Sequence, residues 1–253
     1  MSHNNSSSQF GFSLIEIMVG VVVSSIVMGS LYGLWKRSDM ASRHLQQKSE
    51  LRNRMTLINK TMQNSITLAG YGLINVVDIY KDDATGSDTL TIYSNPASVR
   101  TTLTSAHNHS SPSIHISSTS SFAVGSYVAI SDGTNNEIRK ITQISGNYIT
   151  TSSKFSYDYA IATSTIFPVT KYRYFSDQTL EKMMYEVNDA SAKVIGDKIK
   201  NFQIAFLDKN GSATNIYTQI RSVNYSITGI YPIPTGEISA VTVSSNAIPR
   251  NLM

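Results

Sequence analysis

The chain is poor in several residue types that enzymes and disulfide-stabilised proteins rely on. Its 253 residues include no cysteine, and charged residues make up only 15% of them. Without cysteine the chain can form no disulfide and offers no thiol chemistry, so cysteine usage leaves its compartment open. It also has no phosphate-binding glycine loop, no helical zinc-protease histidine pair and no Gly-x-Ser-x-Gly elbow. We therefore expect neither an enzyme nor a cofactor.

In place of charge the chain is rich in Ser, Thr, Asn and Tyr, a profile common among exported, β-rich proteins. Its length allows one sizeable domain plus an appended helix. The net charge of +4 is unevenly spread, because seven of the 21 Lys and Arg residues lie between Lys36 and Lys60. We name this segment the basic stem. Its partners could be lipid phosphates, acidic neighbouring subunits or, third, DNA.

Charge is nearly absent between Phe12 and Trp35, where Glu16 is the one exception. At about 1.5 Å per residue, a helix of this length can span a bilayer. A carboxylate in such a span is costly, so Glu16 should have a specific partner. No Lys or Arg precedes Lys36, so no side-chain cation lies at that depth. Cutting the chain after Gly11 would supply a cation, the free α-amine of Phe12, one helical turn before Glu16.

The residues from Gly11 to Glu16, Gly-Phe-Ser-Leu-Ile-Glu, resemble the junction of the type IV pilin-like family. The resemblance implies that a prepilin peptidase cuts after Gly11 and methylates the new amine of Phe12. It also implies that residues 1–11 are a leader and that Phe12 and Glu16 are assembly residues, paired within one chain or between subunits. The alternative is an uncleaved signal anchor with a stray Glu. An ordinary secretory signal fits less well, because its apolar core should precede the cleavage site.

The Lys and Arg distribution and the junction predict opposite topologies. The leader contains neither residue, whereas Lys36, Arg37, Arg43 and Lys48 follow the apolar stretch. By the positive-inside rule these residues would place the C-terminal region in the cytoplasm. The family resemblance implies a single pass through the inner membrane with the head in the periplasm, and later a place in a pilus on the cell surface. We follow the junction.

Small residues recur along the apolar stretch. Gly20 is followed by Ser25, Gly29 and Gly33, and the last three stand at intervals of four, on one face of a helix. In lipid such a face lets helices approach closely. We therefore predict that these residues pack against neighbouring helices.

A second, amphipathic pattern follows the apolar one. Neither Pro nor Gly occurs from Leu34 to Ala69, and apolar residues recur there at steps of four and three. The run Gly70-Tyr71-Gly72 predicts the end of a helix, because Gly tolerates the left-handed conformation. The apolar residues of the pattern are Leu51, Met55, Ile58, Met62 and Ile66.

Together these patterns predict an α+β fold. One long helix runs from near Phe12 to Ala69, with residues 12–35 as its transmembrane half and residues 36–70 as its amphipathic half. Residues 71–253 form a head on which the second half packs. Short alternating runs separated by turn residues predict a mainly antiparallel sheet in the head. The runs are 89–93, 113–117, 127–130, 137–144, 148–150, 170–175, 183–187, 202–207, 221–228 and 238–243, and those from 127 to 150 form a β-meander.

Several segments of the head are similar in their order to the PilW type of minor pilin. This resemblance implies a minor pilin that joins other minor and major pilins in a complex that primes pilus assembly or lies near the tip. The alternatives are a minor pseudopilin of a type II secretion system and a DNA-uptake pilin-like subunit that uses the basic stem or the head tyrosines. Leu180-Glu181-Lys182 departs from the Leu-Tyr-Arg strand of PilW. The matching segments include 69–72, 124–133, 172–174, 198–206, 220–223 and 249–252.

Three histidines are the first candidate for a metal site. His107, His109 and His115 fall in the Ser- and Thr-rich segment 95–121, which we expect to be a long surface loop around a short strand at Ile114. A metal site would need further ligands in fixed geometry. The pattern therefore favours a solvated loop.

Three aspartates are the second candidate. Asp82, Asp83 and Asp88 surround Gly86 in a way that resembles a calcium-binding loop. The ligand spacing of an EF-hand is missing. We therefore expect a polar turn and no bound metal.

Overall fold

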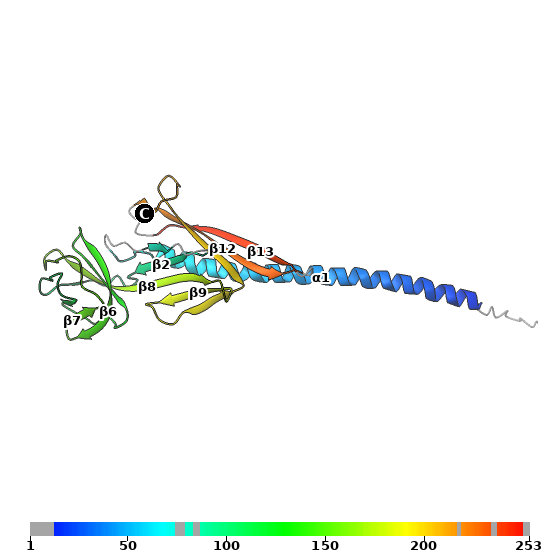
Figure 1. The fold of residues 1–253 in the computed structure, drawn as a ribbon, viewed down its shortest axis with the longest axis horizontal. Helices are drawn as coiled ribbons and strands as arrows, with labels where there is room; N and C mark the ends of the chain where they lie inside the picture. The colour runs from blue at the N-terminus through cyan, green and yellow to red at the C-terminus, as the bar shows by residue number, and fades with distance from the viewer. Residues whose placement is uncertain (1–12, 74–78, 83–86, 217–218, 234–236, 250–253) are drawn as a thin grey trace, which may run out of the picture.

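The computed structural model describes residues 13–73, 79–82, 87–216, 219–233 and 237–249. Gly11, Phe12, Asp83 and Gly86, on which some of the sequence predictions rest, lie outside these ranges. The molecule is elongated, with the N-terminal end of a long helix at one end and a β-rich head at the other (Figure 1).

Helix α1 (Leu14–Thr67) is continuous over 54 residues, which confirms the prediction of one long helix. The five predicted apolar-face residues, from Leu51 to Ile66, are all buried, with exposed fractions of 0–3%. Gly70 and Gly72 have φ angles of 67° and 74°, so the predicted glycine stop is also confirmed. By contrast, every side chain from Leu14 to Arg37 is exposed. Only the second half of the helix packs on the head.

In the described part of the chain, thirteen strands form two sheets in which every pairing is antiparallel. The larger sheet has the order β1-β2-β8-β5-β6-β7-β4, with β3 and β9 on β8 and β10 on β9. The smaller sheet has the order β11-β12-β13. The strands are β1 (Ile79–Asp82), β2 (Thr89–Ser94), β3 (Thr101–Thr102), β4 (Ser113–His115), β5 (Tyr127–Ser131), β6 (Asn136–Ser145), β7 (Tyr148–Thr151), β8 (Thr165–Asp177), β9 (Lys182–Val187), β10 (Lys193–Asp197), β11 (Ile199–Leu207), β12 (Ser222–Pro232) and β13 (Ile238–Ala247).

Strand β8 is shared between two lobes of the head. Its C-terminal part, 170–177, pairs with β2 and β9, and its N-terminal part, 165–169, pairs with β5 and β3. We call the part built on α1 the proximal lobe and the part formed by β3–β7 with the start of β8 the distal lobe. The distal lobe has a buried apolar cluster of its own, and its strands β6 and β7 lie beyond the C-terminal end of α1 (Figure 1).

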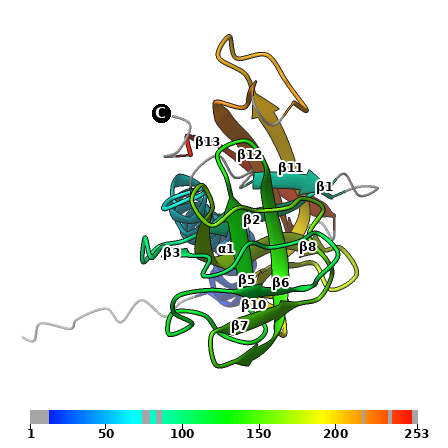
Figure 2. The same cartoon turned by 90° about the vertical axis from the view of Figure 1, so that its left-hand side faces the viewer.

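The proximal lobe buries α1 against both sheets, because its apolar cluster contains residues of the helix, of the larger sheet and of β11–β13. Glycine permits the close approach of α1 to β12. A Cβ atom on Gly229 would lie 2.9 Å from Leu51 Cδ1 and 3.0 Å from Met55 Sδ. Tyr225 Oη donates a hydrogen bond to the Asn59 carbonyl at 3.2 Å. Figure 2 shows α1 end-on, with β12 and β13 to one side of it.

Segment 95–121 corrects one prediction, because it is more than a surface loop. It includes the expected short strand as β4, adds β3, and closes a bridge between Leu103 and Ile116. Both residues are buried in the distal core together with Ile114. Three isolated apolar residues among hydroxyl side chains are enough here, because β5–β8 and the loops beside them supply the rest of the core. The sequence pattern was too sparse to show this.

Candidate assembly site on the N-terminal helix

Glu16 lies in the first turn of α1 and reaches back to the helix start. The Ser13 N–H donates to Glu16 Oε2 at 3.0 Å, and the Glu16 N–H donates to the Ser13 carbonyl at 2.9 Å. A carboxylate at this position satisfies one unpaired backbone N–H and faces the positive end of the helix dipole. It therefore bonds to the amide directly after Phe12. Gly11 and Phe12, the predicted processing residues, lie outside the described residues.

The helix around Glu16 has no protein cover. An 18-residue window of α1 has a mean hydropathy of 2.2, and none of it is buried. By length and composition α1 can therefore cross a membrane. The core helix of a soluble protein would be mostly buried, so this apolar half needs lipid or other helices around it.

The predicted packing residues of the apolar half of α1 are open to a neighbouring helix. Beyond their own helix, the Cβ positions of Gly20, Gly29 and Gly33 have no neighbour within 4 Å, and Ser25 Oγ donates to the Val21 carbonyl at 2.8 Å. That bond satisfies the Ser25 hydroxyl inside its own helix. At about 100° per residue, Ser25, Gly29 and Gly33 (the small-residue face) lie about 180°, 220° and 260° around the helix from Glu16, whereas Gly20 lies about 40° from it. The carboxylate and the small-residue face would therefore meet different neighbours.

The basic stem contains both paired and unpaired side chains. Arg43 Nε lies 2.9 Å from Asp39 Oδ2, and Arg54 pairs with Glu50 at 2.8 Å and also with Asp197. The other five basic residues have no ion-pair partner among the residues that the structure describes. They are Lys36, Arg37, Lys48, Arg52 and Lys60.

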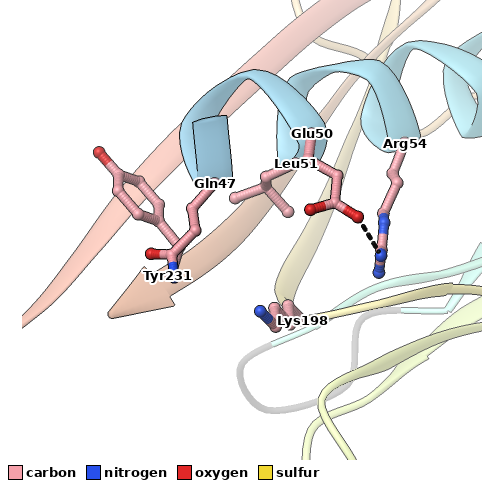
Figure 3. Close-up of a pocket in the computed structure, with 6 residues that line it drawn as sticks. All are labelled: Gln47, Glu50, Leu51, Arg54, Lys198 and Tyr231. Carbon is pink, nitrogen blue, oxygen red and sulfur yellow. Dashed lines mark hydrogen bonds and ion pairs between the residues drawn. The ribbon is translucent and has the colours of Figure 1, made fainter. Parts of the chain in front are cut away.

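Arg54 joins the basic stem to the head through its ion pair with Asp197 of β10, and Figure 3 shows Arg54 beside Glu50. Its hydrogen bond to Asp197 raises the pKa of Arg54 and lowers that of the Asp197 carboxyl. The nearby cavity has a volume of ≈ 20 Å³, which is room for about one water. The lining residues therefore pack α1 against the head and leave no space for a larger molecule. The lining residues are Gln47, Glu50, Leu51, Arg54, Lys198 and Tyr231.

The three predicted histidines each have a different environment. His107 is buried, with its ring centroid 5.1 Å from that of Phe155, which corrects the expectation of a solvated side chain. His109 Nδ1 lies 2.7 Å from Asp158 Oδ1. The His115 ring stacks on a tyrosine ring at 4.3 Å. Among the described residues, no group of three or more His, Asp or Glu side chains could hold a metal ion.

Asp88, from the predicted polar turn, has a structural role. It is only 4% exposed, and its Oδ2 accepts the Ile204 N–H at 2.6 Å. The preceding Ser87 Oγ accepts the Phe202 N–H at 3.2 Å. Ser87 and Asp88 therefore bind β11 along the edge that does not pair with β12. The sequence pattern of three aspartates did not reveal that contact.

Sequence reasoning also missed a polar cluster at the boundary of the two lobes. Asp189 accepts hydrogen bonds from Lys171 Nζ at 2.7 Å and Lys140 Nζ at 2.9 Å, and from Tyr127 Oη. Tyr127 and Lys140 belong to the distal lobe, whereas Asp189 lies in the turn between β9 and β10. No motif marks these residues, because they are brought together only by the long strand β8.

Comparison with known families connects the helix to a processing motif. The family described as "Prokaryotic N-terminal methylation motif" matches residues 6–32, which cover the junction, Glu16 and most of the apolar stretch. This match supports a type IV pilin-like protein with a prepilin leader, a subunit of pilus or secretion assembly. No curated protein and no solved structure matches the chain.

Proposed function

We propose that the chain is a minor pilin of the PilW type that takes part in type IV pilus assembly. Prepilin peptidase removes residues 1–11 and methylates the Phe12 amine. The mature chain is anchored in the inner membrane with its head in the periplasm, and then joins major and minor pilins in a priming or tip complex. It acts as a structural subunit and not as an enzyme.

The observation that carries the proposal is the coincidence of the matched motif with the apolar first half of α1, whose side chains are all exposed from Leu14 to Arg37. Glu16 lies at the start of this helix, with its carboxylate already bonded to the amide next to Phe12. In an assembly, the Phe12 amine of an adjacent subunit would neutralise this carboxylate in a medium that stabilises charge poorly. The small-residue face would pack against another helix.

Substitution of Glu16 tests the charge-pairing step. Glu16→Ala should leave leader cleavage and membrane insertion intact and lower incorporation into filaments by about tenfold or more, because one buried charge pair is lost. Glu181→Ala is the matched control, since Glu181 lies exposed in a turn of the head. Filament fractions probed with an antibody give the measurement. Normal incorporation of the Glu16→Ala chain would refute the pairing mechanism.

Two alternatives rest on specific features. A minor pseudopilin of a type II secretion system would share the junction and helix, and deletion of the gene would then abolish secretion and leave pili intact.

A DNA-uptake subunit would use the five unpaired basic side chains of the stem. Replacement of Lys36, Arg37, Lys48, Arg52 and Lys60 by Gln should abolish uptake if that alternative holds, and unchanged uptake would exclude it.

A further inference from the structure

Strand β13 is a long, regular and uncharged strand at the edge of the small sheet. It pairs with β12 residue for residue over ten positions, from Ile238 opposite Pro232 to Ala247 opposite Val223, without a bulge. Its sequence, Ile-Ser-Ala-Val-Thr-Val-Ser-Ser-Asn-Ala, contains no charged residue and no proline. No backbone hydrogen bond among the described residues reaches its outer side. Such an edge presents a row of free N–H and C=O groups to any extended chain.

The remaining edges in the described part of the head are protected. Strands β3 and β4 have only two and three residues, and β1 has four, including Lys81 and Asp82. Strand β10 begins with Lys193, ends with Asp197 and has a register shift. These are the devices by which proteins block edge-to-edge pairing.

The opposite edge of the same small sheet is also covered. On β11 the Phe202 carbonyl accepts the Asp88 N–H at 2.8 Å, and the Ile204 N–H donates to the Asp88 side chain at 2.6 Å. One edge of the three-stranded sheet is thus closed by its own chain, and the other receives no backbone hydrogen bond from the residues that the structure describes. We infer that β13 is a docking edge, to which a strand of another subunit adds by main-chain hydrogen bonding.

The direction of β13 limits which strand can dock. Tyr225 contacts Asn59, whereas Tyr231, further along β12, has its ring 5.3 Å from that of His44. Strand β12 therefore runs toward the N-terminal end of α1, and β13 runs away from it, as Figure 1 shows. An antiparallel partner must run toward the membrane, if α1 is anchored as proposed above.

A second copy of this chain does not meet that condition. Antiparallel pairing of two β13 edges would point the two α1 helices in opposite directions, which one membrane does not allow. The small sheet is antiparallel throughout, so a strand that continues it runs antiparallel to β13, and the occupant is therefore an extended strand of a different subunit. An uncharged strand fits best, because the outer face beside the edge is itself uncharged. That face contains Asn224, Ser226 and Thr228 of β12 and Thr242, Ser244 and Asn246 of β13.

Hydrogen exchange tests the docking edge directly. In the full-length protein purified alone in detergent, β13 amides that face β12 should exchange slowly, and the alternate, outward amides should exchange quickly. In the same protein within native membranes that contain its partner subunits, the outward amides should slow by about tenfold or more. The Phe202 and Ile204 amides, already bonded to Ser87 and Asp88, should not change. Unchanged fast exchange of the outward β13 amides in the native membranes would overturn the inference.

A matched pair of variants tests whether edge pairing causes this protection. Thr242→Lys with Ser244→Lys places charge on the open strand, whereas Ser226→Lys with Thr228→Lys places it on the same face one strand inward. Protection of the outward amides should be lost in the first variant and kept in the second. Equal behaviour of the two variants would count against edge docking. Thermal melting of both proteins verifies that each is folded.

Self-association has its own test, because the chain has no natural cysteine. A Thr242→Cys chain should give no disulfide-linked dimer in membranes, and a dimer would overturn the assignment to a different subunit. The outcome is also separable from the proposed function. Processed, assembled chains without β13 protection would refute only the docking edge. Protected β13 in a chain that is never cut after Gly11 would refute only the minor pilin proposal.

Discussion

Asp189 connects the two lobes of the head through a single carboxylate. Burial alone would raise its pKa, but hydrogen bonds from Lys171, Tyr127 and Lys140 outweigh burial and hold the pKa of Asp189 well below its usual range. Burial and the bond to Asp189 together raise the pKa of the Tyr127 hydroxyl. The Asp189 carboxylate therefore stays charged at neutral pH and holds the distal lobe on the proximal lobe through Tyr127 and Lys140.

Asp189→Asn should destabilise the head and loosen the distal lobe. The loss should be about 1–3 kcal/mol of unfolding free energy, because two ammonium groups lose their charged acceptor while staying partly exposed. A carboxyl whose folded pKa is depressed stabilises above its unfolded pKa of 3.8, and this contribution is lost as pH falls through the folded value. Chemical denaturation at pH 7 and pH 3 measures both effects, and the stability advantage of the unsubstituted chain over Asp189→Asn should be smaller at pH 3 than at pH 7 but still present. Lys154→Gln, outside the cluster, serves as the control, and an equal loss there would contradict the account.

His107 is a second residue whose environment has a measurable consequence. Burial lowers its pKa from 6.5, and its Nε2 atom has no hydrogen-bond partner among the described residues. Below pH 6.5 the unfolded chain binds a proton that the folded chain does not, so stability should fall as pH drops from 6.5 toward 5. NMR titration of the His107 ring should give a pKa below 6.5. A midpoint at or above 6.5 would contradict this reading of the site.

At the scale of elements, the helix was largely predictable and the sheet order was not. The spacing of the apolar residues and the glycines after the helix predicted both ends of α1 to within about two residues, because these signals are local in the sequence. The ten predicted strand runs correspond to observed strands, and the β5–β6–β7 meander is confirmed. Strands β1, β3 and β10 were missed, since they are short, charged or bulged.

Pairings distant in sequence could not be read from the chain. The division of β8 between two lobes depends on which strands meet it, and no local signal records that choice. The burial of His107 against Phe155 and the contact of Asp88 with β11 are likewise contacts between residues distant in sequence. On the helix, the sequence predicted Glu16 as the residue that needs a partner. Its bond to the Ser13 amide became visible only in three dimensions.

The docking of α1 on β12 depends on one glycine. Gly229→Val should destabilise the head by about 1–3 kcal/mol, because its side chain would overlap Leu51 and Met55. Ser226→Ala, on the outer face of the same strand, is the control and should have little effect. Thermal and denaturant unfolding of the two variants give the comparison. Equal unfolding free energies of the two variants would contradict the prediction, because they would mean that α1 can move away from β12 without loss of stability.

At the scale of the whole molecule, α1 divides the chain into two environments. Its first half has only exposed, mostly apolar side chains, and its second half is part of the core of the head. A protein with this shape is stable in water only if the apolar half is placed in lipid or among other helices. Transfer between those two surroundings is what pilus assembly requires. The account therefore depends on whether the junction before the helix is cut.

The N-terminus of the mature chain tests this central claim most directly. The protein should be extracted from membranes of cells with and without active prepilin peptidase, and its terminal peptide analysed by mass spectrometry. The account predicts a chain that starts at a methylated Phe12 in the first case and an uncut chain in the second, with Gly11→Ala also uncut. A chain that keeps residues 1–11 in cells with active peptidase would contradict the account.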